Sequence, residues 1–139
     1  METRILLVDD FDTMIRIIKN LLNDIGYTNI VTARNGEQAC LILEKETIDF
    51  IISDWNMPRM TGLELLKKVR ATPEWAQIPF LMVTAEAEKE HIAEAIKSGV
   101  DQYIIKPFKQ EKLAQTINLA LANKGQAIRK PPASEVAGS

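Results

Sequence analysis

Residues 50–58, FIISDWNMP, decide the fold of this chain. The near-apolar run from Phe50 to Ser53 is typical of a strand that is buried on both faces in the middle of a parallel sheet. The run stops at the carboxylate of Asp54, and Pro58 prevents further strand pairing because proline has no N–H to donate. Since α/β sheets carry their chemistry at the carboxyl ends of central strands, Asp54 is the candidate reacting group. Taken alone, such an aspartate more often only starts a turn, so the rest of the chain has to decide.

Short apolar runs alternate with amphipathic segments on both sides of this stretch. Further strands are predicted over 4–8, 29–33, 80–83 and 103–105, and apolar residues at helical spacing predict helices over 14–25, 39–43, 62–69, 88–98 and 110–123. Gly26 and Gly99 are placed to end two of these helices. Five β-α units with short connections imply right-handed crossovers. The prediction is an α/β protein with a doubly wound, five-stranded parallel sheet and helices on both faces.

The composition argues against several classes of protein. A formal net charge of −2, from 17 basic and 19 acidic residues, gives no electrostatic footprint for nucleic acid or an anionic membrane. No charged-then-apolar leader opens the chain, and no apolar run approaches the roughly 18 residues of a membrane span. The single cysteine, Cys40, lies in an apolar helical pattern and is expected to be a buried structural thiol. We expect a soluble, cytoplasmic monomer.

The 139 residues suffice for one domain with a single core. We expect this domain to cover residues 1–124. Residues 125–139 contain Pro131 and Pro132 with several Gly, Ala and Ser residues and no apolar period, which predicts a disordered C-terminal tail.

Polar side chains follow four of the five predicted strands. The first strand ends in Asp9 and Asp10, the third in Asp54, the fourth in Thr84 and the fifth in Lys106. Separately, Asp10 and Thr84 could cap the helices that follow them, and Lys106 could be a solvated strand end. In a parallel sheet, however, all carboxyl ends meet at one edge, and so many polar groups would rarely collect there by chance. We interpret them as one site.

These groups suit phosphoryl transfer. Three clustered carboxylates repel one another unless a cation lies between them, and ligation by oxygen alone indicates a hard ion, Mg²⁺. Such an ion would leave Asp54 as a nucleophile toward phosphorus, while Lys106 and the Thr84 hydroxyl bind phosphoryl oxygens. The only histidine, His91, lies on a charged helix and is expected to be merely solvated. The predicted reaction is phosphoryl transfer onto Asp54.

The chain resembles the response-regulator receiver family in four motifs. They are Val8-Asp9-Asp10-Phe11, Ser53-Asp54-Trp55-Asn56-Met57-Pro58 with Gly62, Val83-Thr84-Ala85-Glu86, and Tyr103 with Lys106-Pro107-Phe108. The resemblance covers residues 4 to about 123, so that 1–124 would be the receiver domain. The Asp-Trp-Asn-Met-Pro and Thr-Ala-Glu-Ala runs favour the chemotaxis branch of this family. The flavodoxin-like strand order 2-1-3-4-5 is also taken from the resemblance.

By this resemblance, Asp54 accepts a phosphoryl group from a chemotaxis-type histidine kinase. Asp10, Asp54 and the backbone carbonyl of Asn56 would ligate Mg²⁺ directly, and Asp9 would hold a metal-bound water. Lys106 would pair with the phosphoryl group. The resemblance implies a signalling switch that catalyses only its own phosphorylation and autodephosphorylation, and not an enzyme with another substrate.

The resemblance assigns further residues and leaves one unexplained. The Lys106–Pro107 bond would be cis, as tight proline turns allow, and Asn56 and Glu86 match positions that influence dephosphorylation. Asp12 departs from the family pattern, in which a small polar residue is expected. Its carboxylate could hinder the access of anionic phosphodonors or cap the first helix, and we favour capping.

A switch can be argued from the positions of Thr84 and Tyr103. Phosphorylation would add about −1.5 to −2 charges at the sheet edge. If Thr84 moves toward the phosphoryl group, Tyr103 on the neighbouring strand could turn inward, although it could also be an ordinary aromatic residue of an edge strand. The face that would change comprises the fourth helix, fifth strand and fifth helix. By resemblance, this face binds the flagellar motor switch protein, and a phosphatase is another conceivable partner.

Three alternatives differ in function. A flavin binder would need a first loop that cradles phosphate, whereas residues 9–12 would repel it. An Asp-nucleophile phosphatase of the haloacid dehalogenase type needs a second Asp where this chain has Asn56. The serious alternative is a single-domain receiver in a phosphorelay or in a pathway unrelated to flagella. Within chemotaxis, the sequence does not distinguish a protein that binds the motor from one that acts as a phosphate sink.

Overall fold

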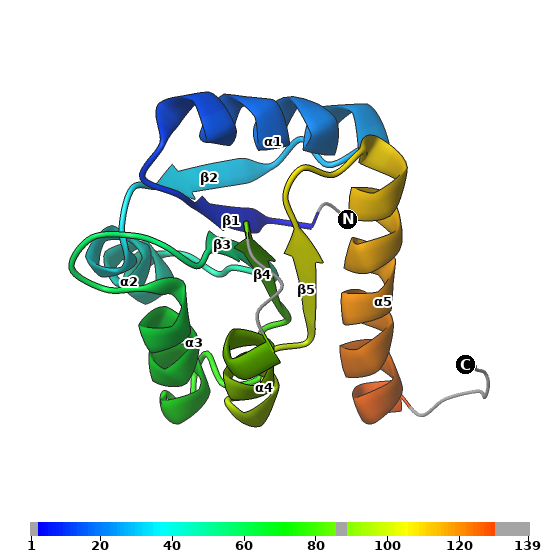
Figure 1. The fold of residues 1–139 in the computed structure, drawn as a ribbon. Coiled ribbons are helices and arrows are strands. Elements are labelled where there is room, and N and C mark those ends of the chain that lie inside the picture. The colour runs from blue at the N-terminus through cyan, green and yellow to red at the C-terminus, as the bar shows by residue number, and fades with distance from the viewer. Residues whose placement is uncertain (1–2, 86–88, 130–139) are drawn as a thin grey trace.

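The computed structural model describes residues 3–85 and 89–129, which form a sheet flanked by helices (Figure 1). The strands are β1 (Ile5–Val8), β2 (Ile30–Ala33), β3 (Phe50–Asp54), β4 (Phe80–Thr84) and β5 (Gln102–Ile105). The helices are α1 (Asp12–Ile25), α2 (Gly36–Lys45), α3 (Gly62–Ala71), α4 (Lys89–Lys97) and α5 (Gln110–Arg129). The strict alternation of strand and helix confirms the predicted α/β class.

The sheet is parallel throughout, and its order is β2-β1-β3-β4-β5, as the resemblance implied. β1, β3 and β4 are buried at every position, which explains why their sequences are nearly continuous apolar runs. The register pairs Val8 with Ser53 and Asp54 with Val83, so these three strands end at a similar level. The prediction that their polar ends share one edge is therefore confirmed.

Helices cover both faces of the sheet, as predicted. α1 and α5 pack on one face, where Ile18 and Leu113 are fully buried against the strands, and α2, α3 and α4 cover the other face (Figure 1). Successive residues of a strand point to opposite faces of the sheet. Ile52 therefore belongs to the core under α1 and α5, and Ile51 belongs to the core under α2, α3 and α4. Each strand thus supplies apolar side chains to two cores.

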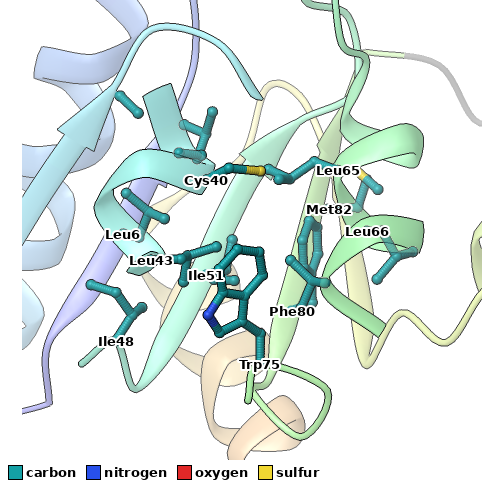
Figure 2. Packing of buried hydrophobic residues seen from close by; sticks show 14 of the residues in the cluster. Leu6, Cys40, Leu43, Ile48, Ile51, Leu65, Leu66, Trp75, Phe80 and Met82 are labelled. Carbon is teal, nitrogen blue, oxygen red and sulfur yellow. The ribbon is translucent and has the colours of Figure 1, made fainter. Parts of the chain in front are cut away.

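The core under α2 and α3 contains the thiol that was predicted to be structural. Cys40 is 7% exposed, and its burial raises the pKa of the thiol, so a reactive thiolate is disfavoured. In the same core, the indole of Trp75 lies among Leu43, Ile48 and Phe80 (Figure 2). Cys40 therefore serves packing.

Two glycines have conformations or neighbours that no other residue would tolerate. Gly26 ends α1 with a φ of 125°, and its N–H donates to the carbonyl of Leu22 at 3.0 Å, which confirms its predicted role. At Gly62, the first residue of α3, a Cβ would lie 2.3 Å from the carbonyl oxygen of Asp54. Only glycine lets α3 start so close to the end of β3, so Gly62 determines the path of the loop that follows Asp54.

The C-terminal end of the last helix differs from the prediction. α5 runs to Arg129, beyond the predicted helix end at Asn123, and the expectation of a disordered tail over 125–139 stays a prediction. The physical reason is that Lys, Gln, Ala and Arg are good helix formers, and one glycine costs only about 1 kcal/mol relative to alanine. Residues 130–139 lie outside the described part of the chain, and the domain boundary at 124 stays a prediction. No helix of the described residues is long and apolar enough to cross a membrane.

Candidate functional site

The carboxyl ends of the strands bring acidic and basic side chains together. Carboxylate oxygens of Asp9, Asp10 and Asp54 all lie within 4.8 Å of one another. The Nζ atom of Lys106 donates a hydrogen bond of 3.1 Å to Oδ1 of Asp54. Thr84 is buried at the end of β4, and its carbonyl accepts a 2.8 Å hydrogen bond from the N–H of Lys106. The five residues that sequence reasoning placed in one site are therefore neighbours at one edge of the sheet.

Asp9 is the most deeply placed carboxylate of this cluster. Its side chain is 2% exposed, and its Oδ1 accepts the N–H of Phe11 at 3.0 Å. Its Oδ2 is buried and has no hydrogen-bond partner among the described residues. Burial raises the pKa of Asp9 from 3.8 to about 6, against the lowering effect of the Phe11 N–H, and the negative charge of Asp54 adds to the increase.

The acidic cluster has the donor chemistry of a cation site. An unpartnered buried carboxylate oxygen is costly, and a nearby cation would remove that cost. All three side chains offer oxygen, the ligand that hard divalent cations prefer. These residues therefore fit a metal ion, as the sequence predicted for Asp9, Asp10 and Asp54.

Asp54 is held rigidly by its neighbours. It is 6% exposed, and burial raises its pKa, whereas the hydrogen bond and the charge of Lys106 lower it. The next residue, Trp55, donates its N–H to the carbonyl of Val83 at 2.9 Å and accepts the N–H of Gly62 at 2.9 Å. The end of β3 is thus attached both to β4 and to the start of α3, which presents the Asp54 carboxylate in a defined position.

Lys106 provides a fixed cation. The Lys106–Pro107 peptide bond is cis, the isomer that the resemblance implied. With its backbone bonded to Thr84 and its ammonium bonded to Asp54, Lys106 connects the ends of β4, β5 and β3. Its side chain is only 23% exposed, which strengthens its interaction with Asp54 relative to a surface pair.

Three other predicted residues occupy different surroundings. Asn56 is exposed in the loop after β3, and Tyr103 is half-buried on β5, opposite Met82, and packs against the core under α2 and α3. Glu86 lies outside the described residues. The roles assigned to these three residues stay predictions.

The expected cap of α1 is wrong. The residue that caps α1 is Phe11, which makes no side-chain capping bond, and Asp12 is already the first helical residue. Its carboxylate forms an ion pair with Arg34, with 2.6 Å between Oδ1 and Nη2. Arg34 was missed by sequence reasoning, although its place directly after β2 puts it on the same sheet edge as the site.

The expectation for His91 is also wrong. Its imidazole is half-buried and stacks on the indole of Trp55, with ring centroids 4.9 Å apart. A signal was available in the sequence, because the apolar Ala95 follows His91 by one helical turn and lies on the same side of the helix. His91 therefore faces the loop that follows Asp54.

A groove lies beside the site, between β5 and the start of α5. Its volume is about 870 Å³, which is within the range of grooves that bind small molecules. Its lining includes Tyr103, Ile105, Lys109 and Lys112. Ile105 is 37% exposed, and Ile96 on the neighbouring α4 is 60% exposed. The α4-β5-α5 face thus combines exposed apolar side chains with lysines.

Comparison with known proteins decides the family. The family model described as response regulator receiver domain matches residues 5–118, most of this chain. The chain belongs to the response-regulator receiver family. The chemotaxis protein CheY of Pseudomonas aeruginosa is 50% identical over 114 residues, which are 82% of this chain and 92% of that protein.

Solved structures agree with this assignment. The chemotaxis response regulator CheY4 of Vibrio cholerae has a TM-score of 0.80 and 35% identity, covering 86% of this chain and 99% of that one. The receiver domain of a sensor histidine kinase from Pseudomonas aeruginosa has a TM-score of 0.75 and 27% identity, and the match covers 83% of this chain and 93% of that one. The latter structure holds a magnesium ion coordinated in its active site cleft.

Proposed function

We propose that this receiver domain accepts a phosphoryl group on Asp54 from a histidine kinase and then binds an output partner through its α4-β5-α5 face. The observation that carries the proposal is the buried Asp54 carboxylate, bonded at 3.1 Å to Lys106 and clustered with Asp9 and Asp10. The relatives named for chemotaxis support the flagellar motor switch as the partner. The domain would act on no other substrate.

The proposed metal ion is Mg²⁺. Asp10, Asp54 and the backbone carbonyl of Asn56 would hold it, and Asp9 would do so through water. The all-oxygen donor set, the unpartnered Oδ2 of Asp9 and the magnesium in the related receiver support this choice. When bound, the ion supplies positive charge that offsets the charge of the carboxylates and of the incoming phosphoryl group.

The chain's own residues account for the transfer. A carboxylate oxygen of Asp54 forms the new bond to phosphorus, while the bond from phosphorus to the donor's imidazole nitrogen breaks and leaves its electron pair on that nitrogen. Lys106, already beside Asp54, can then bond a phosphoryl oxygen, and the Thr84 hydroxyl at the end of β4 can bond another. Rigid placement of these groups before reaction lowers the reorganisation that transfer requires.

The same residues connect the site to the proposed output face. Lys106 follows β5 directly and is bonded to Thr84, while Tyr103 lies on β5 three residues earlier. A shift of Thr84 toward the phosphoryl group would change the space available to Tyr103 and bias two packings of this face. Coupling of this kind is typically about 1–3 kcal/mol.

Binding of a motor-switch peptide tests the proposal. Beryllofluoride with Mg²⁺ stands in for the phosphoryl group on Asp54, and a Trp75→Phe background leaves Trp55 to report occupancy by fluorescence. We expect affinity for the N-terminal segment of a flagellar motor switch protein to rise several-fold only when both additions are present. Asp54→Asn should abolish the fluorescence change and the gain in affinity, whereas Asp24→Asn, an exposed carboxylate on α1, should retain both.

The outcomes separate the two halves of the proposal. Acetyl-phosphate labelling that persists in Asp54→Asn would refute the acceptor. Occupancy reported by Trp55 without peptide binding would leave the acceptor chemistry intact and refute the motor switch as partner. Rapid phosphoryl passage from Asp54 to a histidine phosphotransfer protein would then identify a phosphorelay.

A further inference from the structure

An exposed ion pair joins the start of α1 to the loop after β2, beside the acidic cluster. Nη2 of Arg34 lies 2.6 Å from Oδ1 of Asp12, and the two side chains are 55% and 66% exposed. Arg34 directly follows β2, and Asp12 is the first residue of α1. Since the N–H of Asp9 donates to the carbonyl of Ala33 at 3.0 Å, these segments also meet through their backbones. The pair therefore lies at the same sheet edge as Asp54.

Asp12 makes the rim of the site more acidic. It follows Asp10, the exposed member of the carboxylate cluster, by two positions. Together with Asp9 and Asp54 these are four carboxylates, against one ammonium from Lys106 within this group of residues. A phosphodonor that carries negative charge is repelled by such a cluster, and each added charge at the rim increases the repulsion.

Arg34 carries a positive charge that reduces this repulsion of anionic donors, and it does so from a defined position. Its backbone N–H donates to Oε1 of Gln38 at 2.7 Å, which holds the start of the β2–α2 loop. Exposed ion pairs contribute little to folding stability, so fold maintenance is a weak explanation for this pair. The charge of an exposed arginine still acts on approaching ions within a Debye length of about 8–10 Å.

We propose that Arg34 is a specificity-determining residue for the phosphodonor. By neutralising Asp12, it keeps the site accessible to small dianionic donors such as acetyl phosphate, and it matters less for a monoanionic donor such as phosphoramidate. The inference rests on the proposed role of Asp54 as acceptor, and it concerns only the charge at the entrance.

Donor kinetics test this assignment. The rate of the Trp55 fluorescence change is measured with excess Mg²⁺ and increasing acetyl phosphate or phosphoramidate. We expect Arg34→Gln to lower the second-order rate constant for acetyl phosphate about threefold and that for phosphoramidate by less, with both effects fading at high salt. Asp12→Asn should raise the rate constant for acetyl phosphate. In the double variant, the donor ratio, which is the rate constant for acetyl phosphate divided by that for phosphoramidate, should be close to that of the unaltered protein.

A matched control and an independent check make the result decisive. Lys67→Gln removes an exposed cation from the Lys67–Glu94 pair of α3 and α4 and should leave the donor ratio unchanged. The inference is overturned if Arg34→Gln slows both donors equally, has no effect, or acts equally at low and high salt. If beryllofluoride with Mg²⁺ fails to change Trp55 fluorescence in the unaltered protein, the acceptor role itself fails. If it succeeds while the donor ratio is insensitive to Arg34, only this inference fails.

Discussion

The indole of Trp55 stacks on the imidazole of His91, with the ring planes inclined by 23°. Trp55 directly follows Asp54, and its backbone is bonded to Val83 and Gly62, so its ring position depends on the end of β3. His91 belongs to α4, one of the elements of the proposed output face. The stack is therefore a direct side-chain contact between the loop of the candidate acceptor and that face.

Removing this stack should weaken the protein by a small, measurable amount. We expect His91→Ala to reduce the free energy of unfolding by about 0.5–1.5 kcal/mol, because the indole loses a ring partner. His91→Phe keeps a ring in place and should retain most of this stability. Urea unfolding followed by far-ultraviolet circular dichroism measures both values. Equal losses in the two variants would show that ring stacking is not the cause.

Arg59 should be a site of stabilising substitution. Its φ of 69° lies in the left-handed region, which costs a residue with a Cβ about 1–2 kcal/mol, and its ion pair with Glu37 is largely exposed and contributes little. We expect Arg59→Gly to raise the free energy of unfolding by about 0.5–1 kcal/mol. Arg59→Ala, which removes the pair but keeps a Cβ, should give no gain in thermal unfolding. A gain in the alanine variant as large as in the glycine variant would contradict this explanation.

Sequence reasoning succeeds for the strands and for the residues that end them. β1, β3 and β4 are covered on both faces, so their residues must be almost all apolar, and such runs are easily found. In a parallel sheet the first polar residues after these runs meet at one edge. Asp9, Asp54 and Thr84 could therefore be placed together without knowledge of any contact between them.

Contacts between loops and helices were harder to predict. Arg34 meets Asp12 and His91 meets Trp55 across segments whose local patterns are independent of each other. Periodicity identifies a helix but not which of its polar residues lies on the inner face. The end of α5 was missed for a related reason, since residues after 123 lack an apolar period but retain good helix propensity.

A largely buried ion pair at the opposite end of the sheet should be more important for stability than the exposed ones. Arg70 of α3 donates to Oδ2 of Asp101 at 2.8 Å and to the carbonyls of Gly99, Ala76 and Ile78. Loss of the cation would deprive the Asp101 carboxylate and the three carbonyls of this donor. We expect Arg70→Met to lower the free energy of unfolding by about 3–5 kcal/mol in urea. Its exposed counterpart Lys67→Met should change it by less than about 1 kcal/mol.

The raised pKa of Asp9 predicts a pH dependence for the metal-free protein. A carboxyl group whose pKa is higher in the folded state stabilises that state when protonated, so its contribution is complete below pH 3.8 and is lost as the pH rises through about 6. Ionisation of Asp9 in the folded protein should lower the free energy of unfolding by about 3 kcal/mol. Asp9→Asn keeps an acceptor for the N–H of Phe11 but cannot ionise. In the presence of a chelator it should therefore be more stable than the unaltered protein at pH 7.5.

Thermal unfolding from pH 4 to 8, with chelator or with Mg²⁺, measures this effect. The stability difference between Asp9→Asn and the unaltered protein should grow from pH 4 to pH 6 in chelator and stay level above it. If the proposed Mg²⁺ site is correct, the ion binds the ionised carboxylates, so it should raise the unfolding temperature of the unaltered protein most above pH 6, and that of Asp9→Asn less. Asp24→Asn, which changes an exposed carboxylate, should show neither trend. A difference independent of pH would mean that the Asp9 carboxyl is not strained by burial, and the unpartnered Oδ2 would then no longer support a cation at this position.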